Sequence, residues 1–148
     1  GDTRKSLINL ASRLGINEKV IFHEFVPLEK IAEAMANADI GIIPKHNDLF
    51  GGPAFSTKTL EFMALGIPII LSKTRIDQYY FNESMVKFFE PSDDKDLSEA
   101  MLSLTQNQDL RNNLIQNAKK YIEANNWGIK KKIYLDLVDS LTSEIRQS

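Results

Sequence analysis

Short apolar runs alternate with amphipathic segments along this sequence. Two runs, IGIIP at 40–44 and IPIIL at 67–71, are apolar at almost every position, which is typical of strands buried on both faces of a sheet. Segments with helical spacing separate the runs, so neighbouring strands must pair in parallel through right-handed crossovers. The alternation predicts an α/β fold, a doubly wound parallel sheet with helices on both faces.

Turn residues mark where the expected elements begin and end. Gly15 ends the first helix and Gly66 ends the helix 57–65. After Pro91 the spacing of apolar residues is helical to the end of the chain, in about three helices, the last starting near Trp127. The expected strands are KVIFHEF at 19–25, DIGIIP at 39–44, PIILS at 68–72 and MVKFFE at 85–90, and the other helices are TRKSLINLASRL at 3–14, LEKIAEAMANA at 28–38 and IDQYYFNE at 76–83.

Length and charge exclude several functions. The chain has 148 residues, with 18 basic and 20 acidic side chains, a size that suits one domain with one core. A nucleic-acid partner is not expected, because its phosphates would require a basic patch. The chain has no cysteine, which excludes disulfides and thiolate chemistry and fits a cytoplasmic setting. Its apolar runs are too short to cross a bilayer.

The loop 45–55, KHNDLFGGPAF, is rich in residues that form turns and approach ligands. It follows an expected strand, and ligands of doubly wound sheets bind at the carboxyl ends of the strands. His46 is a candidate polar lining residue. Asp48 is either a ligand contact or an ordinary turn residue. Neither His46 nor His23 has the clustered carboxylates or second ligand that a metal site needs, so no metal is expected.

Lys58 and Glu61 are three residues apart on the helix 57–65, whose expected core stripe is Leu60, Met63 and Ala64. Ser56 is the expected N-cap, and the amides near Ser56 and Thr57 carry the positive end of the helix dipole, where a phosphate binds well. A lysine beside them strengthens such a site. A glutamate can accept two hydroxyl hydrogens from a sugar diol. The alternative is a weak surface ion pair between the two side chains.

Two further groups follow the strand at 68–72. Arg75 and Asp77 are expected to make a local polar contact with each other. At least two of the three consecutive aromatic residues Tyr79, Tyr80 and Phe81 are expected to pack in the core.

The segment FSTKTLEFMALGIPIILSKTRIDQYYF at 55–81, preceded by ADIGIIP and KVIFHEFVP, resembles a known family. It is similar to the C-terminal half of the retaining glycosyltransferases of family 4 (group 1), which have the two-domain GT-B architecture. The resemblance extends from Gly1 to about Trp127 and depends on the order of several segments. It implies that 1–148 is a single Rossmann-like domain, the nucleotide-sugar-binding half of a hexosyltransferase-type enzyme, without its first strands and its N-terminal acceptor domain.

The resemblance also assigns roles to residues. The donor, a nucleotide diphosphate sugar, would bind in this domain, with Glu61 on the ribose hydroxyls and Lys58 near the phosphates or the transferred sugar, and these two are the catalytic candidates. No metal or other cofactor is implied. The acceptor would be a glycan or a lipid-linked molecule held by the N-terminal domain, in bacterial polysaccharide or glycan biosynthesis, in the cytoplasm or at the membrane surface. The full set of donor-binding candidates is Ser56, Thr57, Lys58, Glu61, Asp48, Gly52 and Phe55.

One departure from the family pattern affects the sugar contact. Many members have a second Glu eight positions before the one matched by Glu61, and this sequence has Pro53 there. Asp48 is one candidate to replace that Glu. The backbone amides of Gly52, Ala54 and Phe55 are the other candidates, since Gly-rich loops can present amides to a ligand.

A second departure affects the sheet. Gly1 and Asp2 match the end of the family's second strand, so the basic pair that follows the first strand, and the partner expected for the strand 19–25, are both missing from the sequence. The chain alone is therefore expected to be inactive, and exposed sheet edges predict a homo-oligomer or strand exchange. The alternatives are a non-catalytic nucleotide-binding or interaction module and a sugar-nucleotide epimerase of the same architecture.

Overall fold

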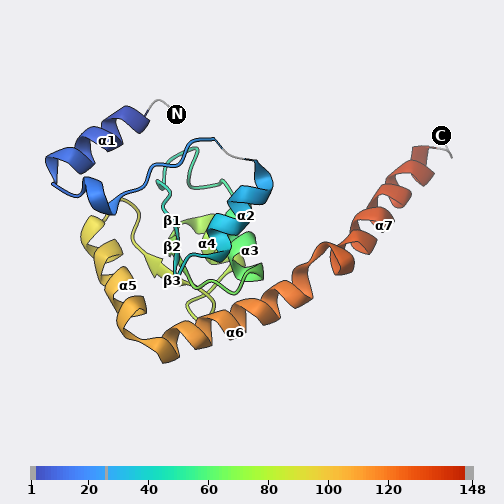
Figure 1. The fold of residues 1–148 in the computed structure, drawn as a ribbon. Coiled ribbons are helices and arrows are strands. Elements are labelled where there is room, and N and C mark those ends of the chain that lie inside the picture. Colours follow the sequence, from blue (N-terminus) through green and yellow to red (C-terminus); the bar gives the residue numbers. More distant parts are fainter. Residues whose placement is uncertain (1–2, 26, 146–148) are drawn as a thin grey trace. The chain divides into compact units, whose positions relative to one another are not determined.

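The computed structural model describes residues 3–25 and 27–145, with side chains described as far as Thr142 (Figure 1). Gly1 and Asp2, which the family resemblance matched to a strand end, lie outside the described residues. The chain divides into two compact units, Gly1–Ala34 and Met35–Ser148. That the chain is a single domain stays a prediction.

The first unit contains helix α1 (Arg4–Arg13), a short 3-10 helix (Asn17–Lys19) and most of helix α2 (Leu28–Ala36). Helix α1 ends as predicted, because Gly15 adopts a φ of +66°, a conformation that glycine takes without steric cost. The prediction of two helices in this part of the chain is confirmed.

The predicted strand 19–25 is wrong. Lys19 belongs to the 3-10 helix, the segment 20–25 has no regular structure, and Phe25 is fully exposed. A strand needs a neighbour to receive its backbone hydrogen bonds, and no strand in the described part of the chain pairs with this segment. The guanidinium of Arg4 instead donates to the carbonyls of Phe22 and His23 at 3.0 and 2.8 Å and pairs with Glu24 at 2.6 Å.

The second unit is built on a parallel sheet of β1 (Gly41–Ile43), β2 (Ile69–Ser72) and β3 (Lys87–Phe89), in the order β1-β2-β3. Ile42 lies opposite Ile70, and Leu71 lies opposite Phe88. The three predicted strands and their parallel pairing are confirmed.

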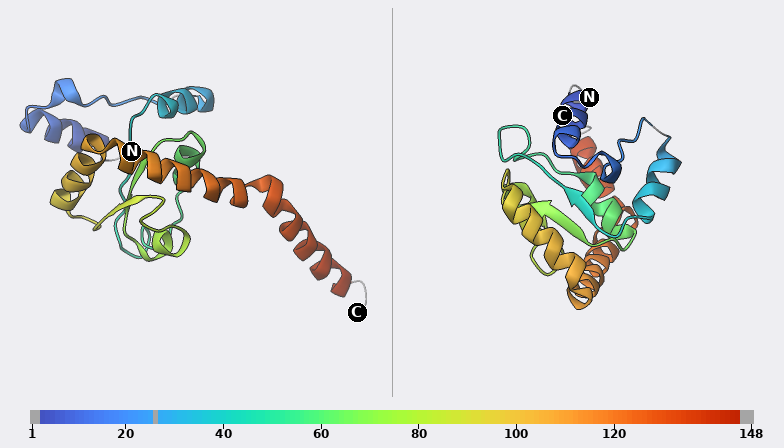
Figure 2. Two further views of the ribbon diagram at one scale, coloured as in Figure 1. Left: turned by 90° about the horizontal axis from the view of Figure 1, so that it is seen from below. Right: turned by 60° about the vertical axis from the view of Figure 1, so that its left-hand side comes forward.

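Helices cover both faces of this sheet. The helices of this unit are α3 (Thr57–Ala64), α4 (Arg75–Tyr80), α5 (Asp94–Gln106), α6 (Gln108–Asn125) and α7 (Trp127–Ile145), and of these α3 and α5 pack on opposite faces of the sheet. Ile69 and Leu71 point into one buried cluster with Met63 of α3, whereas Ile70 points into another with Leu104 of α5. Figure 2 shows α5 running alongside the strands and α7 continuing from α6 away from the sheet. The α/β fold with both faces covered is thus confirmed.

Helix α3 packs with a slightly different face from the predicted one. Met63 and Thr59 are buried and Leu60 is half-buried, but Ala64 is exposed, so its place in the core stripe was wrong. Thr59 and Met63 are one helical turn apart and define the buried face. The predicted stop is confirmed, since Gly66 has a φ of +71°.

Candidate functional site

The carboxyl ends of the three strands meet at one edge of the sheet, where side chains tie the following loops together. The amide of Lys45, just after β1, donates to Ser72 Oγ at the end of β2 at 2.7 Å. His46 Nδ1 lies 3.1 Å from Oγ of Ser92, which follows β3 and has a φ of +67°. The loop that leaves β1 is therefore bonded to segments at the ends of both other strands.

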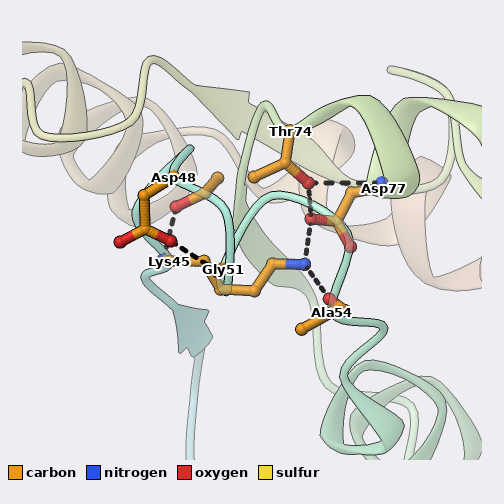
Figure 3. A network of polar contacts seen from close by, with 7 residues as sticks. Lys45, Asp48, Gly51, Ala54, Thr74 and Asp77 are labelled. Atoms are coloured by element: carbon orange, nitrogen blue, oxygen red, sulfur yellow. Dashed lines mark hydrogen bonds and ion pairs between the residues drawn. The ribbon is translucent and has the colours of Figure 1, made fainter.

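Asp77 is the centre of a buried polar cluster at this edge (Figure 3). Its side chain is 0% exposed and forms an ion pair with Lys45, whose side chain is 11% exposed. The Thr74 hydroxyl donates to Asp77 Oδ2 at 2.5 Å, and Lys45 Nζ also donates to the Ala54 carbonyl at 2.8 Å. The expected partner of Asp77 was wrong, because Lys45 and Thr74 bind this carboxylate in place of Arg75.

Asp48 shapes the tip of the loop 45–55. Its Oδ1 accepts hydrogen bonds from the amides of Phe50 and Gly51 at 3.0 and 2.6 Å, while the amide of Gly52 donates to the Asp48 carbonyl at 3.0 Å. These amides hold the pKa of the exposed Asp48 carboxyl below its usual value of 3.8, the Gly51 bond contributing most. Asp48 thus forms a side-chain turn of the kind that Asp commonly makes.

A pocket of about 970 Å³ lies between this loop and helix α4, with Lys73 before the helix also in its wall. Its walls combine charged, amide, aromatic and apolar groups, a mixture typical of small-molecule sites. Asp48 and Gly52, two of the predicted donor-binding residues, lie in its wall. The lining residues are Asn47, Asp48, Leu49, Gly52 and Pro53 from the loop, and Lys73, Arg75, Ile76, Gln78 and Tyr79 from the β2–α4 side.

Helix α3 brings a second group of predicted residues together. Ser56 occupies the N-cap position but its side chain makes no capping hydrogen bond, and Thr57, Lys58 and Glu61 are exposed on the helix that follows. Lys58 and Glu61 thus project from its first turns into solvent. That they bind a ligand stays a prediction. These four residues are absent from the lining of the 970 Å³ pocket. The predicted site residues therefore form two groups, one in the pocket wall and one at the start of α3, and the loop 45–55 connects them.

Two predicted residues take part in contacts within the protein. The ring of Phe55 packs against Tyr80 and Phe81, with centroid distances of 4.9 and 6.0 Å. Of the three consecutive aromatics only Phe81 is buried; Tyr80 is 41% exposed although its ring contacts those of Phe55 and Phe81, so the prediction that at least two of the three pack in the core was wrong. His46, bonded to Ser92, is not among the lining residues of the pocket.

Sequence reasoning did not identify Lys45 as the partner of Asp77 and did not recognise Thr74 as a helix cap. A signal for Thr74 was present, because Thr-x-x-Asp before a helix is typical of a cap, and Thr74 Oγ1 accepts weakly from the Asp77 amide at 3.4 Å. The pairing of Lys45 with Asp77 joins residues 32 positions apart in the sequence, and spacing alone does not reveal such a contact.

Two features are absent from the described residues, a metal-binding cluster and a membrane-spanning helix. Among those residues, no group of three or more His, Asp or Glu side chains could hold a metal ion. No helix within the same residues is both long and apolar enough to cross a membrane. That the activity needs no metal stays a prediction.

The sequence pattern of the family "Glycosyl transferases group 1" matches residues 1–121. This chain belongs to the group 1 glycosyltransferases. The match includes the loop 45–55, the α3 residues Lys58 and Glu61, and the cluster around Asp77. It extends through α6 as far as Tyr121.

Known proteins similar to this group 1 glycosyltransferase chain include a sequence relative and solved structures. An uncharacterized glycosyltransferase of Methanocaldococcus jannaschii is 36% identical over 72 residues, which are 49% of this chain and 17% of that protein. Sucrose-phosphate synthase from Thermosynechococcus elongatus has a TM-score of 0.80 at 21% identity, over 100% of this chain and 36% of that one. Anabaena HepE, solved in complex with UDP and glucose, has a TM-score of 0.78 at 18% identity, over 93% of this chain and 37% of that one.

These structures establish the fold of the second unit as that of a GT-B C-terminal domain. The matched region is about one-sixth of the M. jannaschii relative, and this chain spans little more than a third of each structural neighbour.

Proposed function

We propose that the complete gene product is a family 4 glycosyltransferase that moves a hexose from a nucleotide diphosphate sugar to an acceptor hydroxyl with retention. The observation that carries the proposal is the exposed pair Lys58 and Glu61 at the start of α3, directly after the loop at the carboxyl edge of the sheet. Membership of the group 1 glycosyltransferases supports the reaction class. The complex of the structural neighbour HepE with UDP and glucose supports a nucleotide-sugar donor.

The start of α3 offers positive potential for the diphosphate. The side chain of Ser56 does not cap the helix, and the Thr59 amide donates to the Ser56 carbonyl, so the amides of Thr57 and Lys58 are the ones available to an anion together with the Lys58 ammonium. The leaving diphosphate gains negative charge in the transition state, and fixed positive groups that stabilise this charge accelerate the reaction. We assign this role to Lys58 and to the amides near Ser56 and Thr57.

Glu61 is assigned to the ribose. It lies one turn further along α3 than the first-turn amides, and its carboxylate is exposed. An ionised carboxylate has only acceptor sites, so it can take hydrogen bonds from two neighbouring hydroxyls at once. The spacing of Lys58 and Glu61 suits a ligand with an anionic diphosphate beside a diol.

The pocket beside the loop 45–55 is assigned to the transferred sugar. Its volume of about 970 Å³ lies at the upper end of the range for small-molecule sites. Asp48 keeps one carboxylate oxygen outside the turn that its Oδ1 makes, and Asn47 and Gln78 add amide groups that can bond sugar hydroxyls. The Gly52 amide is already bonded to the Asp48 carbonyl, which favours Asp48 over that amide as the sugar contact.

The proposal also concerns the acceptor, the need for a metal ion and the cellular compartment. We assign the acceptor, a glycan or a lipid-linked molecule, to a part of the protein outside this chain, and the reaction to bacterial glycan biosynthesis in the cytoplasm or at the membrane surface. No metal takes part in the proposed transfer.

A transfer assay tests the proposal directly. The complete gene product is incubated with UDP-, GDP- and ADP-hexoses, with and without EDTA, and a panel of glycan and lipid-linked acceptors. The expected result is transfer from one donor class, unaffected by EDTA, with the donor's anomeric configuration kept in the product's NMR spectrum. Nucleotide binding without transfer, or an inverted product, would contradict the proposal.

A further inference from the structure

Lys45 makes contacts with three separate segments of the second unit. Its amide donates to Ser72 at the end of β2, its ammonium donates to the carbonyl of Ala54 at the far end of the loop, and the same ammonium pairs with Asp77 of α4. Figure 3 shows the side chain reaching from the loop's start toward both Ala54 and Asp77. One nearly buried side chain therefore links β1, the end of the loop and α4.

The pair is poorly explained by stability alone. Asp77 is completely buried, and its Oδ1 accepts no hydrogen bond within the part of the chain that the structure describes. Removing two charges from water carries a large penalty, and well-packed apolar residues often stabilise a protein equally well or better. What an apolar pair could not supply is the directed bond from the ammonium to the Ala54 carbonyl.

That bond acts at a sensitive place. Ala54 lies two residues before Ser56, the N-cap of α3. The bonds that Asp48 receives from Phe50 and Gly51 are local to the loop tip and do not attach the loop to the sheet. The position of the backbone just before α3 therefore depends on the Lys45 bond and on the packing of Phe55 against Tyr80.

We propose that Lys45 and Asp77 are positioning residues, which hold the backbone around Ala54 so that the start of α3 presents its amides and Lys58 to the donor diphosphate. The inference rests on the proposed function, since the group being positioned is the assigned phosphate site. The Asp77 carboxylate holds the Lys45 ammonium in place, and the ammonium in turn holds the Ala54 carbonyl. Neither residue contacts the donor.

The test separates positioning from stability by using two variants of the complete gene product. Lys45→Met keeps an apolar side chain of similar length, removes the bond to Ala54 and leaves Asp77 buried without a counter-charge. Lys45→Met combined with Asp77→Leu removes the bond and the uncompensated charge together. Lys120→Met, on the exposed surface of α6, is the matched control.

We expect Lys45→Met to raise the KM for the donor about 10-fold or more, because a misplacement of about 1 Å in a binding group has effects of this size. The acceptor KM stays unchanged, and hydrogen exchange over 45–56 becomes faster. The double variant regains thermal stability relative to Lys45→Met but keeps the raised donor KM. Lys120→Met matches wild type in every measurement.

Two results would overturn the inference. One is a donor KM in Lys45→Met equal to that of wild type. The other is a double variant that recovers the donor KM together with its stability, which would leave the pair a purely structural role. If the wild-type protein transfers no sugar, the proposed function is wrong, whatever the variants do. If hydrogen exchange over 45–56 is the same in Lys45→Met as in wild type, Lys45 does not hold the loop, and the inference is wrong independently of the transfer reaction.

Discussion

The ring of Phe62 lies directly against the backbone of Gly41. A Cβ built on Gly41 would come within 2.8 Å of Cγ and Cδ2 of this ring, closer than side chains pack. Gly41 begins β1 and Phe62 lies in the middle of α3, so the missing side chain lets the helix sit close to the strand. This contact helps to place the start of α3 relative to the carboxyl edge of the sheet.

Gly41→Ala should destabilise the protein. The added methyl must displace the Phe62 ring or shift α3, and overpacking of this kind lowers the free energy of unfolding by about 1–3 kcal/mol. Denaturant unfolding of wild type and variant measures the change. Gly41→Ala combined with Phe62→Leu should lose less stability than the two single variants together, and strict additivity would show that the two groups do not clash.

Thr59→Val should leave stability unchanged or raise it. Thr59 is completely buried on α3, and its Oγ1 has no hydrogen-bond partner among the described residues. Valine has nearly the same shape without the hydroxyl. Burying it does not require an unpaired hydroxyl to be removed from water, so the free energy of unfolding should rise by as much as about 1 kcal/mol. Thermal unfolding checks this, and a clear loss of stability would mean that the hydroxyl has a partner in solution.

The turn at Asp48 should open in acid. The amides of Gly51 and Phe50 lower the pKa of this carboxyl below 3.8 in the folded protein, so the turn's contribution to stability is present above that value. It is lost as the pH falls through the folded-state pKa. The chemical shift of the Gly51 amide, followed by NMR, should titrate with a midpoint below 3.8. Asp48→Asn should abolish this titration, whereas a wild-type midpoint at or above 3.8 would show that the bonds do not form in solution.

Lys58→Met should weaken the binding of phosphates but not of nucleosides. Hydrogen bonds to charged groups contribute about 1.5–3 kcal/mol, so the Kd for a nucleoside diphosphate should rise about 10- to 100-fold. The Kd for the matching nucleoside should not change. Isothermal titration calorimetry of both ligands decides this, with Lys120→Met as the control. An equal loss for the nucleoside and its diphosphate would place Lys58 outside the phosphate site.

Local signals predicted the second unit well. The apolar runs around Ile42 and Ile70 identified buried parallel strands, because strands covered on both faces have few polar positions. Gly66 identified the end of α3, and Gly15 the end of α1 in the first unit, because both adopt a positive φ. Lys58 and Glu61 were predicted as donor contacts from helical spacing and family pattern; the structure shows both exposed on α3, and their role stays a prediction.

Contacts between distant residues were not predictable. The apolar composition of 19–25 indicated a strand, but a strand also requires a paired neighbour, and Arg4 bonds the backbone there instead. Asp77 was matched with Arg75, two positions away on α4, although its partner Lys45 lies in the loop 45–55. Tertiary contacts of this kind depend on the whole fold.

The most direct measurement concerns Glu61 and the ribose. The nucleoside diphosphate that binds most tightly and its 2′-deoxy form are titrated into the complete gene product and into Glu61→Ala. If Glu61 accepts from the ribose hydroxyls, wild type should bind the deoxy form about 10-fold or more weakly, and Glu61→Ala should bind both forms equally. If wild type binds both forms equally, or if Glu61→Ala still prefers the ribose form by the same factor, Glu61 does not hold the ribose and the proposed donor site is wrong.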